Sequence, residues 1–173
     1  MNLRPMLGVL GLGAAVALTA AAAGAQTAVA TPNAKYEYRQ KSEANVAKIG
    51  MQTEKLIMKL QADNSDYGGH KGAAIGSLQT AQTELNAAAQ YAAEHGYQMP
   101  VQTKPMKQPK GNKTHAQSDW SIEKAQTTVQ RWITHLQSDS RDFGGHRAAA
   151  INALQQAETE LTAATQFAAA HGH

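Results

Sequence analysis

The sequence contains no cysteine, which excludes disulfide bonds, thiolate metal centres, covalently attached c-type haem and a lipid-modified N-terminal cysteine. Aromatic residues make up only 5% of the 173 residues although 42% are apolar. Because alanine supplies much of that apolar content, we expect a thin and closely packed core. The formal charge of +3 is too small to indicate nucleic-acid binding. These limits favour one small domain that folds without covalent cross-links.

Several motifs of enzymes are also missing. The chain has no P-loop, no Gly-x-Ser-x-Gly elbow and no His-Glu-x-x-His pair. It also lacks the Glu-x-x-His pair of ferritin-like di-iron centres. No nucleophile–base or acid–base set stands out, so we expect a protein that is not an enzyme.

The N-terminus is typical of an export signal. Met1–Arg4 is a short basic start, and an apolar run follows from about Met6 to Ala23. Cleavage after Ala25 fits the small-x-small pattern that signal peptidase reads, and Ala30 ends a second candidate. We therefore expect residues 1–25 to be a signal peptide, residues 26–37 to be a flexible tail, and the mature protein to be periplasmic or secreted.

The remaining chain contains an internal repeat. When position 55 is set on position 131, the segment 55–97 aligns with 131–173 without a gap, and more than half of the positions are identical. We call positions that this alignment pairs repeat-related. A repeat of this length indicates one supersecondary unit used twice. Each copy contains an Asp-x-x-Asp-(Tyr/Phe)-Gly-Gly-His turn, 63–70 in the first and 139–146 in the second.

Each copy is predicted to be a helical hairpin. In the first copy, apolar residues recur every three or four positions from about 38 to 62 and again from about 67 to 95. We predict an all-α fold, an antiparallel four-helix bundle formed by hairpin 38–97 and hairpin 119–173. Alanines on the second helices should let a neighbouring helix approach closely. The same seams could also close between two chains, giving a homodimer.

The turn residues have expected structural roles. Asp63 and Asp66 are candidate caps of the following helix. Gly68 and Gly69 predict a tight turn or a close backbone approach that a side chain would block. Tyr67 and its counterpart Phe143 are expected to close the end of the core.

The turn followed by an alanine-rich helix resembles short exported bacterial proteins of uncharacterised function that carry Asp-Tyr-x-Gly-His turns. The resemblance covers only the repeat units, and it implies neither an activity nor any site residue.

Residues 98–118 have a different composition. They hold three prolines and four lysines spaced three apart, Lys104, Lys107, Lys110 and Lys113, without an acidic residue among those lysines. We predict an extended basic linker. Its charge could attract anionic surfaces such as lipid headgroups or acidic cell-wall polymers, although a solvated linker is the simpler interpretation.

The histidines are the strongest candidates for chemistry. In an up-down-up-down bundle the second helices run parallel, so His70 and His146 should share one end with the turn aspartates. Imidazole and carboxylate ligands suit Zn²⁺, Ni²⁺ or Cu²⁺. The candidate metal ligands are His70, His146, Asp63, Asp66, Asp139 and Asp142.

A structural role for these residues is the leading alternative. His70 would pack on the apolar stripe and bond to carbonyls at the end of the preceding helix. His95 and His171 fit helix ends that are followed by a C′ glycine. The sequence thus favours a small exported, non-enzymatic protein with a binding or structural role outside the cytoplasm. Transition-metal binding through the duplicated turns is the other hypothesis.

Overall fold

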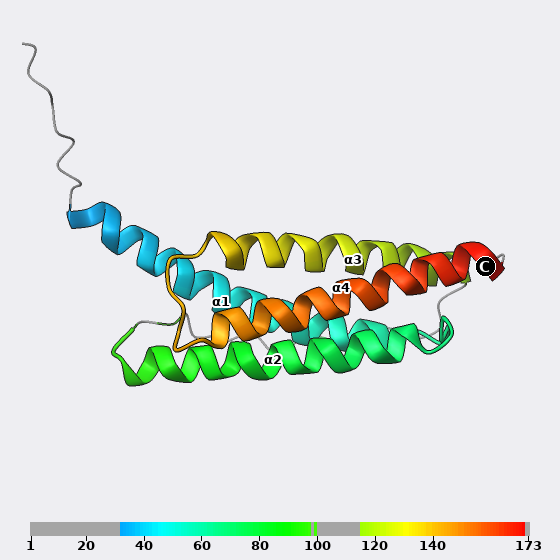
Figure 1. Cartoon of the computed structure of the whole chain (residues 1–173), viewed down its shortest axis with the longest axis horizontal. Coiled ribbons are helices and arrows are strands. Elements are labelled where there is room, and N and C mark those ends of the chain that lie inside the picture. The colour runs from blue at the N-terminus through cyan, green and yellow to red at the C-terminus, as the bar shows by residue number, and fades with distance from the viewer. Residues whose placement is uncertain (1–31, 98, 100–114, 172–173) are drawn as a thin grey trace, which may run out of the picture. The chain divides into compact units, whose positions relative to one another are not determined.

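The computed structural model describes residues 32–97, 99 and 115–171, and this part of the chain is all-helical, as predicted, with no strand. Its four helices pack against one another (Figure 1). The predicted signal peptide lies outside the described residues. The helices are α1 (Pro32–Gln61), α2 (His70–Glu94), α3 (His115–Ser138) and α4 (His146–His171).

The first and third helices begin earlier than the sequence indicates. Helix α1 starts at Pro32, so residues 32–37 are not the predicted tail. Proline is favourable at a first helical position, because its missing N–H has no intrahelical acceptor there. Helix α3 starts at His115, inside the predicted linker 98–118. Both added segments are mostly polar, so hydrophobic periodicity could not detect them.

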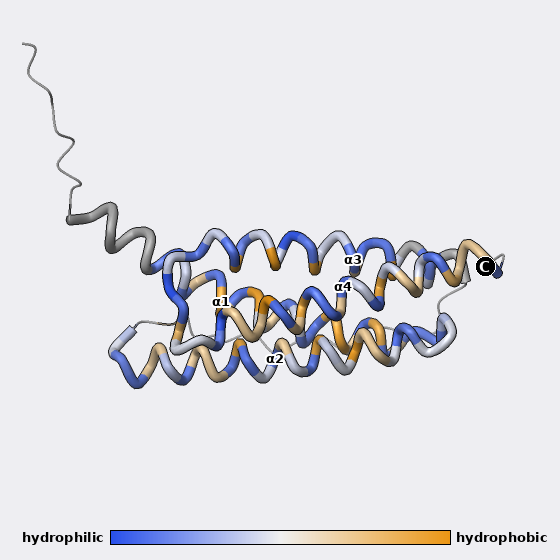
Figure 2. Tube along the Cα trace, viewed as in Figure 1, coloured by the Kyte–Doolittle hydropathy of each residue, from blue (hydrophilic) through white to orange (hydrophobic). Residues whose placement is uncertain are grey.

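Helices α2 and α4 are the most closely packed pair, and α1 and α3 are the least closely packed neighbours. The buried seams of α2 and α4 are made largely of alanine, which brings helix backbones close together, as expected. Buried α2 and α4 alanines are Ala74, Ala81, Ala88, Ala92, Ala150, Ala153, Ala157, Ala164 and Ala168. Figure 2 shows the apolar residues gathered where the helices face one another.

Contacts along the helices establish their directions. Gly68, before α2, lies against Phe167 near the end of α4, and Gly144, before α4, lies against Tyr91 near the end of α2. The starts of α2 and α4 therefore lie at opposite ends, as the colours of Figure 1 also show. The expectation that the two second helices run parallel is wrong.

The same reversal applies to α1 and α3. Asn45, in the first half of α1, bonds to Asp139 just after α3, and Ser118 at the start of α3 bonds to Asp63 just after α1. Because α3 begins beside the end of α1, Tyr97 and His115 lie at opposite ends of the four-helix unit. The predicted up-down-up-down order requires a connection between neighbouring ends. A segment of this length can make either connection, at about 3.3 Å for each residue.

The core is one cluster that all four helices share. Its largest fully buried side chains include Leu60, Leu78, Leu136 and Leu154, which form repeat-related pairs. Tyr67 and Phe143 are 3% exposed, so both rings are buried as expected. Within the described ranges, no helix combines the length and apolarity required to span a bilayer.

Candidate functional site

The two turns have the same backbone conformation. Tyr67, Gly68 and Gly69 have φ values of 56°, 64° and 88°. Phe143, Gly144 and Gly145 follow with 54°, 67° and 93°. A left-handed aromatic residue is unfavourable in isolation. Burial of each ring in the core holds the chain in this conformation.

The first glycine of each turn is required for two reasons: its φ is positive, and a side chain there would collide with an aromatic ring. A Cβ on Gly68 would lie 2.8 Å from the ring of Phe167, and a Cβ on Gly144 would lie 2.8 Å from the ring of Tyr91. The predicted close approach is therefore confirmed. Nothing lies within 4 Å of a Cβ on Gly69 or Gly145, so those positions need glycine only for their positive φ.

The two candidate metal-binding histidines are far apart. His70 Nδ1 lies 2.8 Å from Glu160 Oε2 of α4, and His146 Nδ1 lies 2.8 Å from Glu84 Oε2 of α2. His70 and Glu84, the partner of His146, lie about 21 Å apart along α2 at helical rise. The expectation that His70 and His146 share one end is wrong, because α2 and α4 run in opposite directions.

The turn aspartates are divided in the same way. Asp63 is 3% exposed, and its Oδ1 accepts hydrogen bonds from the Ser65 N–H and the Ser118 hydroxyl. Asp139 Oδ1 accepts from Asn45 Nδ2 at 2.8 Å. Each of these two buried aspartates thus fastens its turn to the other repeat. Of the remaining pair, Asp142 lies 3.9 Å from Arg147 Nε, and Asp66 is exposed.

The predicted capping role of Asp63 and Asp66 is wrong for α2. The N-cap of α2 is Gly69 in the left-handed conformation, and no side chain makes a capping hydrogen bond there. The Asp66 carbonyl, rather than its carboxylate, accepts the Gly69 N–H at 3.3 Å. The chain enters the helix through a backbone turn that places a glycine, which has no side chain, at the N-cap position.

Within the part of the chain that the structure describes, no group of three or more His, Asp or Glu side chains could hold a metal ion. The six candidate ligands do not converge. Each of the two histidines instead has a glutamate from the other repeat as its partner, and an imidazole N–H donates well to a carboxylate.

The residue after each histidine bonds to the preceding helix end. Lys71 Nζ donates to the Asp63 carbonyl at 2.6 Å. Arg147 donates to the carbonyls of Leu136 and Asp139 at 2.8 and 2.7 Å. Carbonyls at a helix end have no intrahelical donor and need an external one. The sequence prediction assigned such a bond to His70, but the structure pairs His70 with Glu160.

His95 and His171 close the ends of their own helices. Their Nδ1 atoms donate to the Tyr91 and Phe167 carbonyls at 2.7 and 2.8 Å, and their rings stack on those aromatics at 3.9 Å. After His95, Gly96 has φ 70°, and the Tyr97 N–H bonds to the Ala92 carbonyl at 2.7 Å. This is a Schellman ending with a C′ glycine, as predicted. Gly172 lies outside the described residues.

Two turn-end groups have shifted acidity. Burial raises the pKa of the Asp139 carboxyl above its usual value of 3.8, although Asn45 and Arg147 oppose the shift. Burial, together with the bond to Asp119, raises the pKa of the Tyr67 hydroxyl above its usual range. Neither group has the arrangement of a nucleophile with a base.

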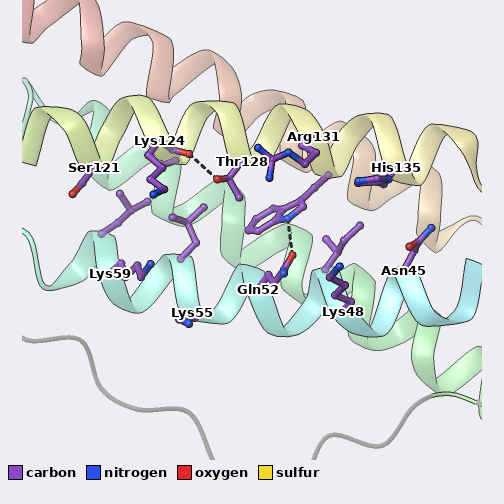
Figure 3. A pocket seen from close by; sticks show the side chains of 15 residues that line it. Asn45, Lys48, Gln52, Lys55, Lys59, Ser121, Lys124, Thr128, Arg131 and His135 are labelled. Atoms are coloured by element: carbon purple, nitrogen blue, oxygen red, sulfur yellow. Dashed lines mark hydrogen bonds between the residues drawn. The ribbon is translucent and has the colours of Figure 1, made fainter. Parts of the chain in front are cut away.

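A cavity lies elsewhere, in a groove between α1 and α3 (Figure 3). Its volume is about 580 Å³, within the range of small-molecule sites. The floor is apolar and includes Trp132, which is 4% exposed and donates from Nε1 to Gln52 Oε1 at 2.9 Å. The other apolar lining residues are Ile49, Leu56, Leu60 and Ala125.

The rim of this groove is basic. Among the described residues that line it, none is an aspartate or a glutamate. Five carry a permanent positive charge and one is a histidine, and all six are exposed. We call the five charged residues the groove cations: Lys48, Lys55, Lys59, Lys124 and Arg131; His135 is the sixth basic residue of the rim. An apolar floor under a basic rim is suited to an anion with an apolar body.

The sequence interpretation missed this site, although a signal was present. Lys48, Lys55 and Lys59 recur at steps of seven and four, which places them on one helix face beside the apolar stripe. The residues 76 positions further along the chain, Lys124, Arg131 and His135, are also basic. The lysines of the linker are more obvious in the sequence, and the prediction used only those.

No protein-family model, no curated protein and no solved structure matches this chain.

Proposed function

We propose that this chain is a small exported, non-enzymatic protein that binds an anionic ligand in the groove between α1 and α3, outside the cytoplasm. The observation that carries the proposal is the groove itself, whose described lining combines an apolar floor, six basic side chains and no acidic one. The export step rests on the basic start, apolar run and cleavage pattern of residues 1–30.

The same proposal includes an architecture. We infer an antiparallel four-helix bundle made by duplication of one hairpin. It is supported by contacts that recur at repeat-related positions, such as His70–Glu160 with His146–Glu84 and Gly68–Phe167 with Gly144–Tyr91. In this arrangement the duplicated turns hold the bundle together, and the groove is left for the ligand.

The turns support a structural role rather than a reactive one. His70 and His146 are joined to glutamates of the other repeat, and His95 and His171 are joined to carbonyls of their own helices. Transition-metal binding through the turns is the weaker hypothesis, since the six proposed ligands are divided between two ends.

Anilinonaphthalene sulfonate, an anion with an apolar body, tests the proposal. We expect its fluorescence to rise on the folded mature protein, at temperatures far below the melting transition so that partly unfolded states do not contribute. Lys55→Gln/Arg131→Gln removes two groove cations and should weaken binding roughly fivefold. The matched control, Lys104→Gln/Lys107→Gln, removes two linker lysines and should leave binding unchanged. Equal weakening by both pairs would contradict the proposal.

A further inference from the structure

The groove is symmetric in its charge. The repeat alignment pairs Lys55 with Arg131 and Lys59 with His135, and the same offset of 76 residues pairs Lys48 with Lys124, upstream of the aligned segments. Between 45–60 and 121–136 most positions differ, and the floor changes from Leu56 in one copy to Trp132 in the other. A basic side chain is nevertheless present in both members of all three pairs. General similarity between the copies does not account for this, so we relate the basic side chains to the groove that they line.

The helix register brings basic side chains to the same level at both ends of the groove. The Gln52–Trp132 and Asn45–Asp139 bonds set α1 against α3 in opposite directions. Counted from these bonds, Lys59 lies level with Lys124, and Lys48 lies level with His135. Figure 3 shows the same arrangement. Two basic side chains at the same level of a groove can both contact one anionic group.

The shape of the groove limits its occupant. From Lys48 to Lys59 the helix rises about 16 Å. The Gln52–Trp132 bond of 2.9 Å joins the two walls between the ends. An α-helix with side chains is about 10 Å across, which is wide for a groove whose two walls are joined by one side-chain hydrogen bond, so a partner helix would lie on the rim. A thin, extended apolar chain matches the floor better.

We propose that the groove binds a linear hydrocarbon chain that carries a carboxylate at each end. The chain lies along Leu56 and Trp132, one carboxylate lies between Lys59 and Lys124, and the other lies near Lys48 and His135. Lys55 and Arg131 add positive potential at mid-length. This ligand class deepens the proposed function and rests on it, because it requires the groove to be the binding site.

The test uses four probes of equal chain length on the mature protein with Trp120→Phe, which leaves Trp132 as the sole tryptophan. The probes are dodecanedioate, dodecanoate, dodecanediol and dodecyltrimethylammonium, each below its micelle concentration. Binding is followed by Trp132 fluorescence. We expect one molecule bound per chain and affinity in the order dianion, monoanion, diol, cation. Each carboxylate should add roughly fivefold, and salt at about 0.5 M should weaken the dianion most.

Variants of one groove end make the test specific. In Lys59→Gln/Lys124→Gln, the affinity for dodecanedioate should fall roughly fivefold, to that for dodecanoate. The affinity for dodecanoate itself should change less, because this probe can use the other end. Lys48→Gln/His135→Gln should give the same pattern, and Lys104→Gln/Lys107→Gln should give none. Far-UV circular dichroism and the melting temperature verify that each variant is folded.

The outcomes separate this inference from the proposed function. Binding of anilinonaphthalene sulfonate without preference for the dianion over the diol overturns the ligand class and leaves the groove as an anion site. Failure of the dye and of all four probes overturns both. Tight binding of an acidic amphipathic peptide, with no binding of dodecanedioate, also overturns the ligand class and favours a protein partner.

Discussion

The α2–α4 face and the α1–α3 face of this molecule are built from opposite materials. Small alanines line the first, and reciprocal contacts fasten it at each turn, with His70 on Glu160 and His146 on Glu84. Large side chains and exposed cations line the second, which the bond from Trp132 to Gln52 spans. Close packing of one face and open packing of the other leave a cavity without opening the core. The repeated turns can therefore stabilise the fold without any contribution from the groove, which is the proposed binding site.

The largest expected effect lies at the closed face. Gly68→Ala should destabilise the protein by roughly 2–4 kcal/mol, because the new Cβ would meet the Phe167 ring at 2.8 Å in a left-handed backbone. Gly69→Ala, with the same backbone constraint but open space, should cost only about 1–2 kcal/mol. Urea denaturation of the two variants and the wild type measures both losses of unfolding free energy. Equal losses would show that the ring contact contributes nothing.

A matched pair of substitutions compares the two faces directly. Ala81→Leu adds bulk to a fully buried position of α2 and should cost roughly 1–3 kcal/mol through overpacking. Ala125→Leu adds the same bulk at a position that is also buried, at 2% exposure, but that borders the cavity, so it should cost less than Ala81→Leu. Thermal melts of both variants provide the measurement. An equal loss at Ala125 would mean that the open face is closed in solution.

These two faces also show what the sequence could predict. The all-helical class and the close approach of α2 and α4 followed from periodicity and alanine, because both depend on local spacing. The relative direction of the hairpins did not follow, because a linker of this length can join either end. That direction decides where His70 and His146 lie. Because the second helices are antiparallel, the two histidines lie at opposite ends and cannot share one metal ion. The groove was missed because its two halves lie in different repeats, far apart in the sequence.

The reciprocal histidine contacts make a smaller contribution. His70→Ala/His146→Ala should lower stability by roughly 0.5–1.5 kcal/mol for each lost hydrogen bond, since both rings are partly exposed. The melting temperature should fall by the same amount in EDTA and with added Zn²⁺, Ni²⁺ or Cu²⁺. A metal-dependent rise that occurs only with both histidines present would instead support the metal hypothesis.

The smallest effect concerns the buried carboxyl beside Asn45. Burial raises the pKa of Asp139 above its usual 3.8, so the folded state keeps its proton to higher pH than the unfolded state. Its contribution to stability is therefore present below about pH 4 and is lost as pH rises through the raised pKa. Asp139→Asn removes this titration and keeps an acceptor for Asn45.

Melting temperatures of the wild type and Asp139→Asn, followed from about pH 3 to about pH 7, measure this effect. The wild type should lose stability relative to the variant as pH rises. Other carboxyls titrate in both proteins, so the difference isolates Asp139. A difference that stays constant with pH would show that the carboxyl titrates normally.

The contacts between the two hairpins are reciprocal. His70 of the first hairpin contacts Glu160 of the second, and the repeat-related residues make the same contact in reverse, from His146 to Glu84. Two identical subunits of an isologous dimer contact each other in this way. A polypeptide of one hairpin would thus have the surface to assemble with its own copy around a two-fold axis through the groove. If the chain arose by the proposed duplication, its two halves were free to diverge, and they differ between Tyr67 and Phe143 and between Leu56 and Trp132.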